Sequence, residues 1–149
     1  TKQKLDNLYV CEKCGFKDWI NPRPTNEVIV VNDEGKILFI RRAHEPQKGL
    51  LDLPGGFMDL DENCEEAAAR EATSMIYIGS HVDVPKYVYE GHEYETVCLI
   101  FVARVEGFDV VAGDDADDFE WLAWDEIPME ELAFDCNRVG LRKWKAMQR

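Results

Sequence analysis

The segment that decides the fold of this chain covers residues 53–78 and reads LPGGFMDLDENCEEAAAREATSMIYI. It begins with Pro54 and two glycines, residue types that interrupt regular structure and mark a loop. An alanine-rich stretch follows, and alanine is the strongest helix former. Asn63 and Glu66 have the spacing of a capping box, in which each side chain accepts a hydrogen bond from the backbone of the other residue. The segment therefore predicts a loop that leads into a helix starting near residue 64.

The polar residues of this segment follow a defined spacing. Gly56 is followed after five residues by Glu62, and seven further residues precede the pair Arg70 and Glu71. Together with residues 53–55, this spacing resembles the first half of the Nudix box, G-x5-E-x7-R-E-U-x-E-E-x-G-U, where U is a bulky aliphatic residue. The resemblance implies a MutT-like hydrolase, a pyrophosphatase by chemistry. It also implies the Nudix fold, a mixed β-sheet in an α-β-α sandwich.

The resemblance implies a role for each matching residue. In the family, Glu71 and two glutamates three and four positions later share one helical face and bind Mg²⁺ or Mn²⁺, cations that prefer oxygen ligands. Such ions neutralise a pyrophosphate and lower the pKa of the attacking water. Arg70 orients a glutamate through a charge-assisted hydrogen bond, and Glu62 supports the loop. Gly55 and Gly56 belong to the loop that the substrate passes.

The second half of the motif is not retained. Ser74 and Met75 occupy the positions of the two glutamates, and Tyr77 occupies the position of the glycine. A hydroxyl is a weak neutral ligand and a thioether prefers soft metals, so neither replaces a carboxylate for Mg²⁺. Residues 73–78 also contain β-branched and aromatic side chains, which disfavour a helix. We therefore expect the helix to fray or end early, and a degenerate metal site in which Glu71 is the surviving ligand.

Two functions are compatible with this mixture of retained and lost residues. One is a Nudix-type hydrolase that cleaves a phosphoanhydride in a nucleoside diphosphate linked to another moiety, at an impaired rate and with Mg²⁺ or Mn²⁺. The other is a catalytically inactive Nudix domain that binds a nucleotide or a protein. The second is favoured by the loss of the acidic cluster from an otherwise preserved scaffold. Enzymatic activity therefore stays open, and a nucleotide-type small molecule is the expected partner.

Further candidates for the cleft lie outside the motif. Arg41 and Arg42 end a strand that borders the substrate cleft in relatives, which makes them candidates to bind phosphate oxygens. Because successive side chains of a strand point to opposite faces, at most one of them is expected to face the cleft. The acidic loop at residues 113–118 either supplies a further carboxylate near Glu71 or is a solvated loop. Both interpretations stay open.

Strand patterns flank the motif on both sides. Residues 28–31 are a run of Val and Ile, residues 36–42 form a second apolar segment, and the Asn-Asp-Glu-Gly sequence between them predicts a hairpin turn. Further strands are expected at residues 50–53, 82–84, 87–89, 93–105, 108–111 and 121–124. Asp125 and Asp135 are expected to cap two C-terminal helices. Strands around one helix, with helices at the end, predict an α/β (α+β) fold with a mixed sheet packed between helices. The resemblance implies that residues 25–149 are the Nudix domain.

A short extension, residues 1–24, precedes this domain and contains a single C-x2-C knuckle, Cys11 and Cys14. A structural zinc site needs four ligands, and no second knuckle is present. A bound zinc and a site shared between two chains are alternatives, but we expect a turn without zinc. The extension also carries apolar and aromatic residues that would suit a homodimer contact, namely Tyr9, Phe16, Trp19 and Ile20.

The charge and hydropathy of the chain exclude several partners. The net charge of −13 at pH 7 argues against a nucleic-acid backbone, because that partner requires a basic surface. A phosphate-bearing substrate would need cations to offset this charge. No apolar run approaches the roughly 20 residues that span a bilayer. The first residues lack the apolar core of a signal peptide, so we expect a cytoplasmic protein that binds no membrane.

Overall fold

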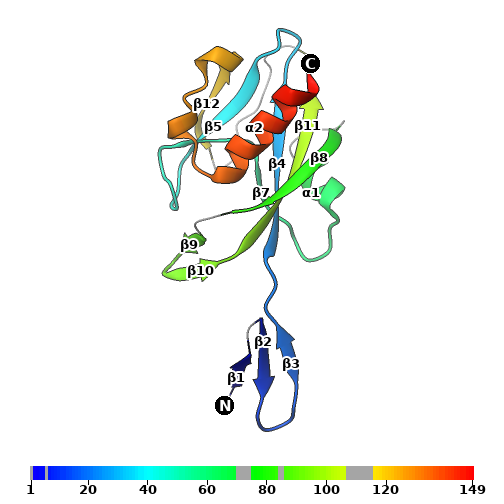
Figure 1. Ribbon diagram of the computed structural model, residues 1–149. Coiled ribbons are helices and arrows are strands. Elements are labelled where there is room, and N and C mark those ends of the chain that lie inside the picture. Colours follow the sequence, from blue (N-terminus) through cyan, green and yellow to red (C-terminus); the bar gives the residue numbers. More distant parts are fainter. Residues whose placement is uncertain (1, 6, 70–74, 84–85, 107–115) are drawn as a thin grey trace.

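The main body of the protein is a mixed sheet, seen in a computed structural model that describes residues 2–5, 7–69, 75–83, 86–106 and 116–149. Its strands follow the order β12-β5-β4-β11-β8, with β6 beside β5 and β7 beside β4 (Figure 1). Strands β4 and β11 run parallel, and the other pairs are antiparallel. The strands are β4 (Arg23–Val31), β5 (Ile37–Arg42), β6 (Leu51–Asp52), β7 (Gly55–Phe57), β8 (Met75–Val82), β11 (Thr96–Arg104) and β12 (Ala116–Leu122).

Two α-helices, α1 (Cys64–Ala69) and α2 (Asp135–Met147), pack against opposite faces of this sheet. The short elements are β9 (Tyr87–Tyr89), β10 (His92–Tyr94) and the 3-10 turns η1 (Trp124–Glu126) and η2 (Met129–Glu131). In the described part of the chain, no helix is long and apolar enough to cross a bilayer. The expected α-β-α sandwich is confirmed.

Strand β4 lies at the centre of the sandwich and is buried on both faces. Ile29 and Val31 belong to a core cluster that contains Leu141 of α2. Val28 and Val30 belong to a second cluster that contains Ala68 of α1. Alternation along a strand sends these side chains to opposite faces, and an unbroken apolar run is typical of a strand covered on both sides. The run of Val and Ile therefore sets the position of both helices.

Two local features predicted from the sequence are present. In the turn between β4 and β5, Asn32 Oδ1 accepts a hydrogen bond from the amide of Lys36 at 2.9 Å, and Gly35 has a φ of 77°. At the start of α1, the amide of Glu66 donates to Asn63 Oδ1 at 2.8 Å, and the amide of Asn63 donates to Glu66 Oε2 at 2.9 Å. The hairpin and the capping box are both confirmed.

The two predicted C-terminal caps differ from the structure. Asp125 lies inside η1, a single 3-10 turn, and does not cap an α-helix. Asp135 is the first residue of α2, and the capping position is Phe134. Asn137 Oδ1 accepts the hydrogen bond of the Phe134 amide at 3.0 Å, so the amide side chain closes this helix end. The strand predicted at residues 108–111 lies outside the described residues.

Strand β8 begins earlier than the sequence predicts. Residues 75–78 are in an extended strand, with Met75 paired to Ala103 of β11, whereas the predicted strand starts at residue 82. The Ile-Tyr-Ile sequence after Met75 suits a strand, because β-branched and aromatic residues pack well on a pleated surface. Gly79 has a φ of 147° where the pairing with β11 shifts register, a conformation that glycine adopts without strain. The last motif positions, residues 75–78, therefore belong to a strand.

A separate antiparallel sheet of three strands, β1 (Lys2–Leu5), β2 (Leu8–Cys11) and β3 (Lys17–Trp19), lies apart from the main body (Figure 1). Cys11 and Cys14 lie at the turn between β2 and β3. The amide of Cys11 donates to Phe16 O and the amide of Gly15 donates to Cys11 O, both at 2.8 Å. Phe16 and Trp19 are exposed. The C-x2-C knuckle therefore forms the tip of a hairpin.

The pairing of β7 with β4 generates a prediction about stability. A Cβ atom on Gly55 would lie 2.2 Å from Asn26 O and 2.8 Å from Glu27 Cα, whereas a Cβ atom on Gly56 would meet nothing within 4 Å. We predict that Gly55→Ala lowers the free energy of unfolding by about 1–3 kcal/mol, because two backbones must separate. Gly56→Ala is the matched control and stays within about 0.5 kcal/mol of the unaltered protein. Urea unfolding measures both, and equal losses would contradict the close approach.

Candidate functional site

A cavity of about 680 Å³ opens beside the start of β4 and the end of β5. Strand β7, strand β9 and the first turn of α2 form its other walls. Its volume falls in the range of roughly 300–1,000 Å³ that is typical of small-molecule sites. Gly55 and Gly56, both predicted to bind substrate, line this cavity together with Arg42. We take it as the candidate site.

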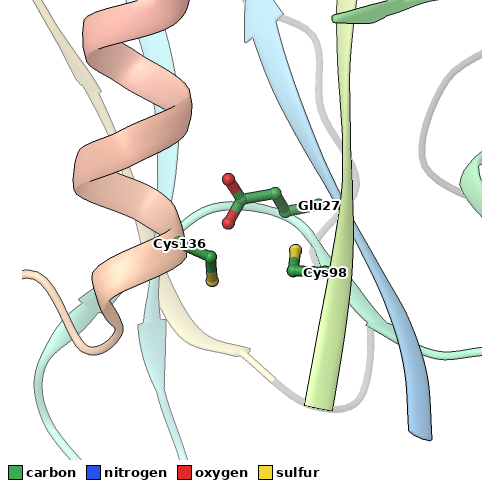
Figure 2. A group of neighbouring side chains, drawn as sticks. All are labelled: Glu27, Cys98 and Cys136. Carbon is green, nitrogen blue, oxygen red and sulfur yellow. The ribbon is translucent and has the colours of Figure 1, made fainter. Parts of the chain in front are cut away.

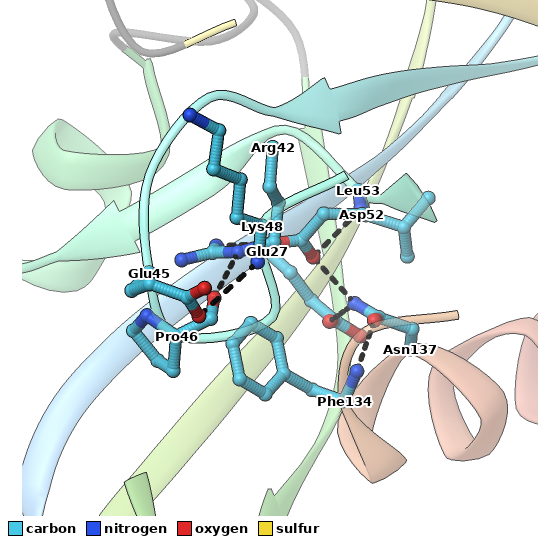
Figure 3. Close-up of polar contacts among 9 residues, drawn as sticks. All are labelled: Glu27, Arg42, Glu45, Pro46, Lys48, Asp52, Leu53, Phe134 and Asn137. Carbon is cyan, nitrogen blue, oxygen red and sulfur yellow. Dashed lines mark hydrogen bonds and ion pairs between the residues drawn. The ribbon is translucent and has the colours of Figure 1, made fainter. Parts of the chain in front are cut away.

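Arg42 is held against the cavity wall by three contacts (Figure 3). Its Nη1 donates to Asp52 Oδ2 at 2.7 Å, and its Nε donates to the carbonyl oxygen of Pro46 at 2.8 Å. The guanidinium carbon lies 4.9 Å from the centre of the Phe134 ring, within the range of a cation–π contact. The contacts fix the guanidinium as a rigid, permanently charged group at the cavity surface.

Arg41 points away from the cavity. Its guanidinium pairs with Glu120 of β12 and donates to the carbonyl oxygen of Gly49 at 2.8 Å. Of the two neighbouring arginines, Arg42 lines the cavity and Arg41 does not, as the alternation of side chains along a strand predicts. Binding of substrate by Arg42 stays a prediction, and Arg41 is the less suitable of the two candidates.

Three polar side chains meet below Arg42 in a buried network. The Nδ2 group of Asn137 donates to Glu27 Oε2 and to Asp52 Oδ1, each at 2.9 Å (Figure 3). Asp52 Oδ1 also accepts from the amide of Leu53 at 2.9 Å. Glu27 is 2% exposed and Asn137 is 0% exposed. Hydrogen bonding of this kind is the usual condition for burying polar groups.

Burial dominates the electrostatics of the network. It is the largest cause of the rise in the pKa of Glu27 to about 8, to which the neighbouring Asp52 carboxylate also contributes, whereas the hydrogen bond from Asn137 lowers the pKa. Burial also raises the pKa of Asp52, although the Arg42 guanidinium opposes that shift. Glu27 is therefore protonated at neutral pH, which reduces the negative charge beside the cavity.

The sequence alone does not predict this network. Glu27 and Asn137 are separated by 110 positions, and Asp52 and Asn137 by 85. No local spacing connects residues so far apart. The available signal was a charged residue, Glu27, directly before the apolar run of β4, because an ionisable side chain in a central strand needs a buried partner.

The motif residues are only partly described by the structure. Glu62 Oε1 accepts a hydrogen bond from the amide of Asp59 at 2.6 Å, which closes the loop before α1. Arg70, Glu71 and Ser74, named as catalytic residues or ligand positions, lie outside the described residues. Their roles stay predictions.

The position expected for Met75 needs correction. The motif places this residue on the helical face of the metal ligands, but it begins β8 and packs against the core cluster that contains Val28 and Ala68. A thioether in apolar surroundings does not fit Mg²⁺ or Mn²⁺, which take oxygen ligands. The reason is the strand pairing with β11, which draws residues 75–78 out of any helix. Most of the acidic loop at residues 113–118 lies outside the described residues.

The buried carboxyl of Glu27 generates a prediction about pH. Its pKa rises from 4.5 in the unfolded chain to about 8 in the folded protein. Between these values the folded protein binds one more proton than the unfolded chain, so the free energy of unfolding falls as the pH rises through this window. Glu27→Gln is expected to remove this part of the fall, whereas Glu34→Gln in the exposed turn leaves it unchanged. Urea unfolding with EDTA at about pH 5.5 and about pH 8 checks this, and parallel pH profiles for all three proteins would contradict it.

Comparison with known proteins extends the motif match to most of the chain. The family model described as NUDIX domain matches residues 21–143. An ADP-ribose pyrophosphatase of Methanocaldococcus jannaschii is 31% identical over 122 residues, covering 78% of this chain and 71% of that protein. A MutT-like protein of Streptomyces ambofaciens is 33% identical over 99 residues, covering 66% of this chain and 62% of that protein.

Solved structures show the same fold. The NUDIX domain of Shewanella oneidensis NrtR, complexed with ADP ribose, superposes with a TM-score of 0.72 at 18% identity, covering 87% of this chain and 90% of that chain. A MutT/nudix family protein of Enterococcus faecalis superposes with a TM-score of 0.69 at 19% identity, covering 87% of this chain and 63% of that chain. The sandwich, the motif and the family match agree: this chain belongs to the Nudix hydrolase family.

Proposed function

We propose that this protein binds a nucleoside diphosphate linked to another moiety, of the ADP-ribose class, and cleaves its phosphoanhydride at an impaired rate. The observation that carries the proposal is the cavity of about 680 Å³, where a guanidinium, a glycine pair and three aromatic rings meet. Two comparisons support this class of ligand. One relative is described as an ADP-ribose pyrophosphatase, and one structural neighbour is a complex with ADP ribose.

The aromatic part of the cavity suits a nucleobase. The rings of Phe57 and Tyr87 meet edge to face with centroids 5.4 Å apart, and Tyr87 and Phe134 follow at 5.8 Å. Aromatic faces stack on bases and contribute roughly 1–3 kcal/mol per base. Adenine would therefore lie against this aromatic wall.

The polar part of the cavity suits a diphosphate. Contacts with described residues use two of the five N–H donors of Arg42, and a guanidinium binds phosphate oxygens through paired donors. Lys86 and Arg138 add two further cations to the lining. In a chain with a net charge of −13, such local cations are needed to attract an anionic ligand. Arg42 and the glycine pair are the proposed diphosphate contacts.

The proposed impairment of catalysis rests on the ligand positions of the motif. Mg²⁺ or Mn²⁺ would polarise the phosphoanhydride, and Glu71 is the one carboxylate retained for it. Met75 does not fit as a ligand, because it packs in an apolar cluster. The same observation favours the second candidate function, a catalytically inactive domain that binds a nucleotide or a protein. In both cases the cavity is the binding site.

Further elements of the proposal concern partners and location. We place the protein in the cytoplasm, without nucleic-acid or membrane binding, in keeping with its acidic charge. A homodimer contact through the N-terminal sheet is supported by the exposed Phe16 and Trp19, 66% and 56% exposed. Zinc binding by Cys11 and Cys14 is not part of the proposal.

The function is tested by ligand binding and turnover in paired arginine variants. We predict that ADP-ribose binds to the unaltered protein, and that Arg42→Lys weakens binding about tenfold because a lysine keeps the charge and loses the paired donors. Arg41→Lys, the matched control, changes the dissociation constant less than about twofold. Calorimetry measures binding, and chromatography measures AMP release with Mg²⁺ or Mn²⁺, which we expect to be slow. Absence of binding, equal losses in both variants, or rapid turnover would each contradict a stated part of the proposal.

The strand position of Met75 generates a second prediction. Restoring the motif with Met75→Glu is expected to destabilise the protein by about 1–3 kcal/mol and not to increase turnover, because the carboxylate would enter an apolar cluster. Ile76→Glu is the matched control, since Ile76 is 68% exposed and tolerates a charge. Thermal unfolding and Mg²⁺-dependent AMP release measure the two effects. Faster turnover in Met75→Glu would place the residue back among the metal ligands.

A further inference from the structure

Three side chains with metal-binding chemistry meet at the inner end of the cavity. Glu27 of β4, Cys98 of β11 and Cys136 of α2 each line the cavity, and one ligand atom from each lies within 4.8 Å of the other two. Figure 2 shows the carboxylate and the two sulfur atoms gathered between the strands and the helix. All three residues are buried.

The fold brings these residues together through strand pairing and helix docking. The parallel pairing of β11 with β4 places Cys98 opposite Thr25, near Glu27. Cys136 is held at the start of α2, where its amide donates to Asp83 Oδ1 at 2.9 Å. The cluster is therefore built from three elements that are each fixed independently of any ligand.

The carboxylate of Glu27 is only half satisfied. Its Oε2 accepts from Asn137, but its Oε1 has no hydrogen-bond partner among the described residues, although Glu27 is 2% exposed. A buried polar atom without a hydrogen-bond partner destabilises the folded state. Asn137 orients the carboxylate in the way that hydrogen-bonded neighbours orient metal ligands. A bound cation would satisfy the remaining oxygen.

We propose that Glu27, Cys98 and Cys136 form a site for a borderline-soft divalent cation, Zn²⁺ by chemical class, whose fourth ligand is a water molecule from the cavity. Two sulfurs and one carboxylate match the ligand preferences of zinc and do not match those of Mg²⁺. In a tetrahedral zinc site the ligand atoms lie about 3.5–3.8 Å apart, so the cluster needs only a small contraction. Binding would release protons from the three ligands.

This site is distinct from the metal site that the Nudix motif implies. Glu27 and Cys98 face α2, in the core cluster that contains Cys98, Cys136 and Leu141. The motif helix α1 packs against the opposite face of the sheet, beside Val28. The metal titrations contain no nucleotide, so they test zinc binding separately from ADP-ribose binding.

Cobalt titration tests the proposal, because thiolate ligands give Co²⁺ an intense sulfur-to-cobalt charge-transfer absorption. The starting protein carries Cys11→Ser and Cys14→Ser, which removes the knuckle as a competing thiol pair. We expect one equivalent of Co²⁺ with this absorption, displaced by Zn²⁺. Adding Cys98→Ala or Cys136→Ala should lower the absorption at least about twofold and weaken binding at least about tenfold, and both changes together should abolish the absorption. Cys64→Ala, a thiol outside the cluster, is the matched control and should leave both unchanged.

A second measurement keeps the test valid if a variant is unstable. Zn²⁺ should raise the midpoint of thermal unfolding of the starting protein by binding the folded state, and this rise should disappear in Glu27→Gln. Circular dichroism without metal confirms that each variant is folded. No cobalt absorption in the starting protein would overturn the proposal, as would absorption that survives Cys98→Ala and Cys136→Ala. A zinc-dependent rise in the midpoint that persists in Glu27→Gln would remove Glu27 from the site.

Discussion

The burial of strand β4 on both faces is the constraint on which the rest of the structure depends. Its alternating side chains divide between two core clusters, one under α2 and one under α1. The same alternation directs Glu27, at the edge of the apolar run, toward α2. A shift of one residue would reverse every side chain of the strand, so the register that satisfies the core also positions the buried carboxylate.

The proposed ligand is an anion, although the chain itself is strongly acidic. Arg42 offers a guanidinium at the cavity surface, while Asp52 and Asn137 hold it and Glu27 in place. A protonated Glu27 lowers the local negative charge that a phosphate would meet. The close approach of α2 to this network depends on Gly140, where a Cβ atom would lie 2.6 Å from Glu27 Oε1. The buried polar network and the close packing of α2 on the sheet therefore meet at Glu27.

The departure from the Nudix box is a change of secondary structure as well as of residue type. Where the motif continues a helix, this chain pairs Met75 with Ala103 in strand β8. If only the ligand residues had changed, the helix would remain, and substituting glutamates back into it would restore the metal ligands. A strand at this position removes the geometry that makes three carboxylates converge. The cavity lined by Arg42, Gly55 and Gly56 is formed although residues 75–78 lie in a strand.

The sequence by itself determined the features that depend on neighbouring residues. The glycine loop and capping box of α1, the turn at Gly35 and the apolar run of β4 all follow from local spacing. The spacing of Gly56, Glu62, Arg70 and Glu71 carried the resemblance to the Nudix family. Only the tertiary structure decided which distant residues meet: Glu27 with Asn137, and Cys98 with Cys136. The same holds for Met75, whose strand is selected by pairing with β11. Local sequence patterns determine individual helices, strands and turns. Contacts between residues far apart in the chain form only when the strands and helices pack into one core.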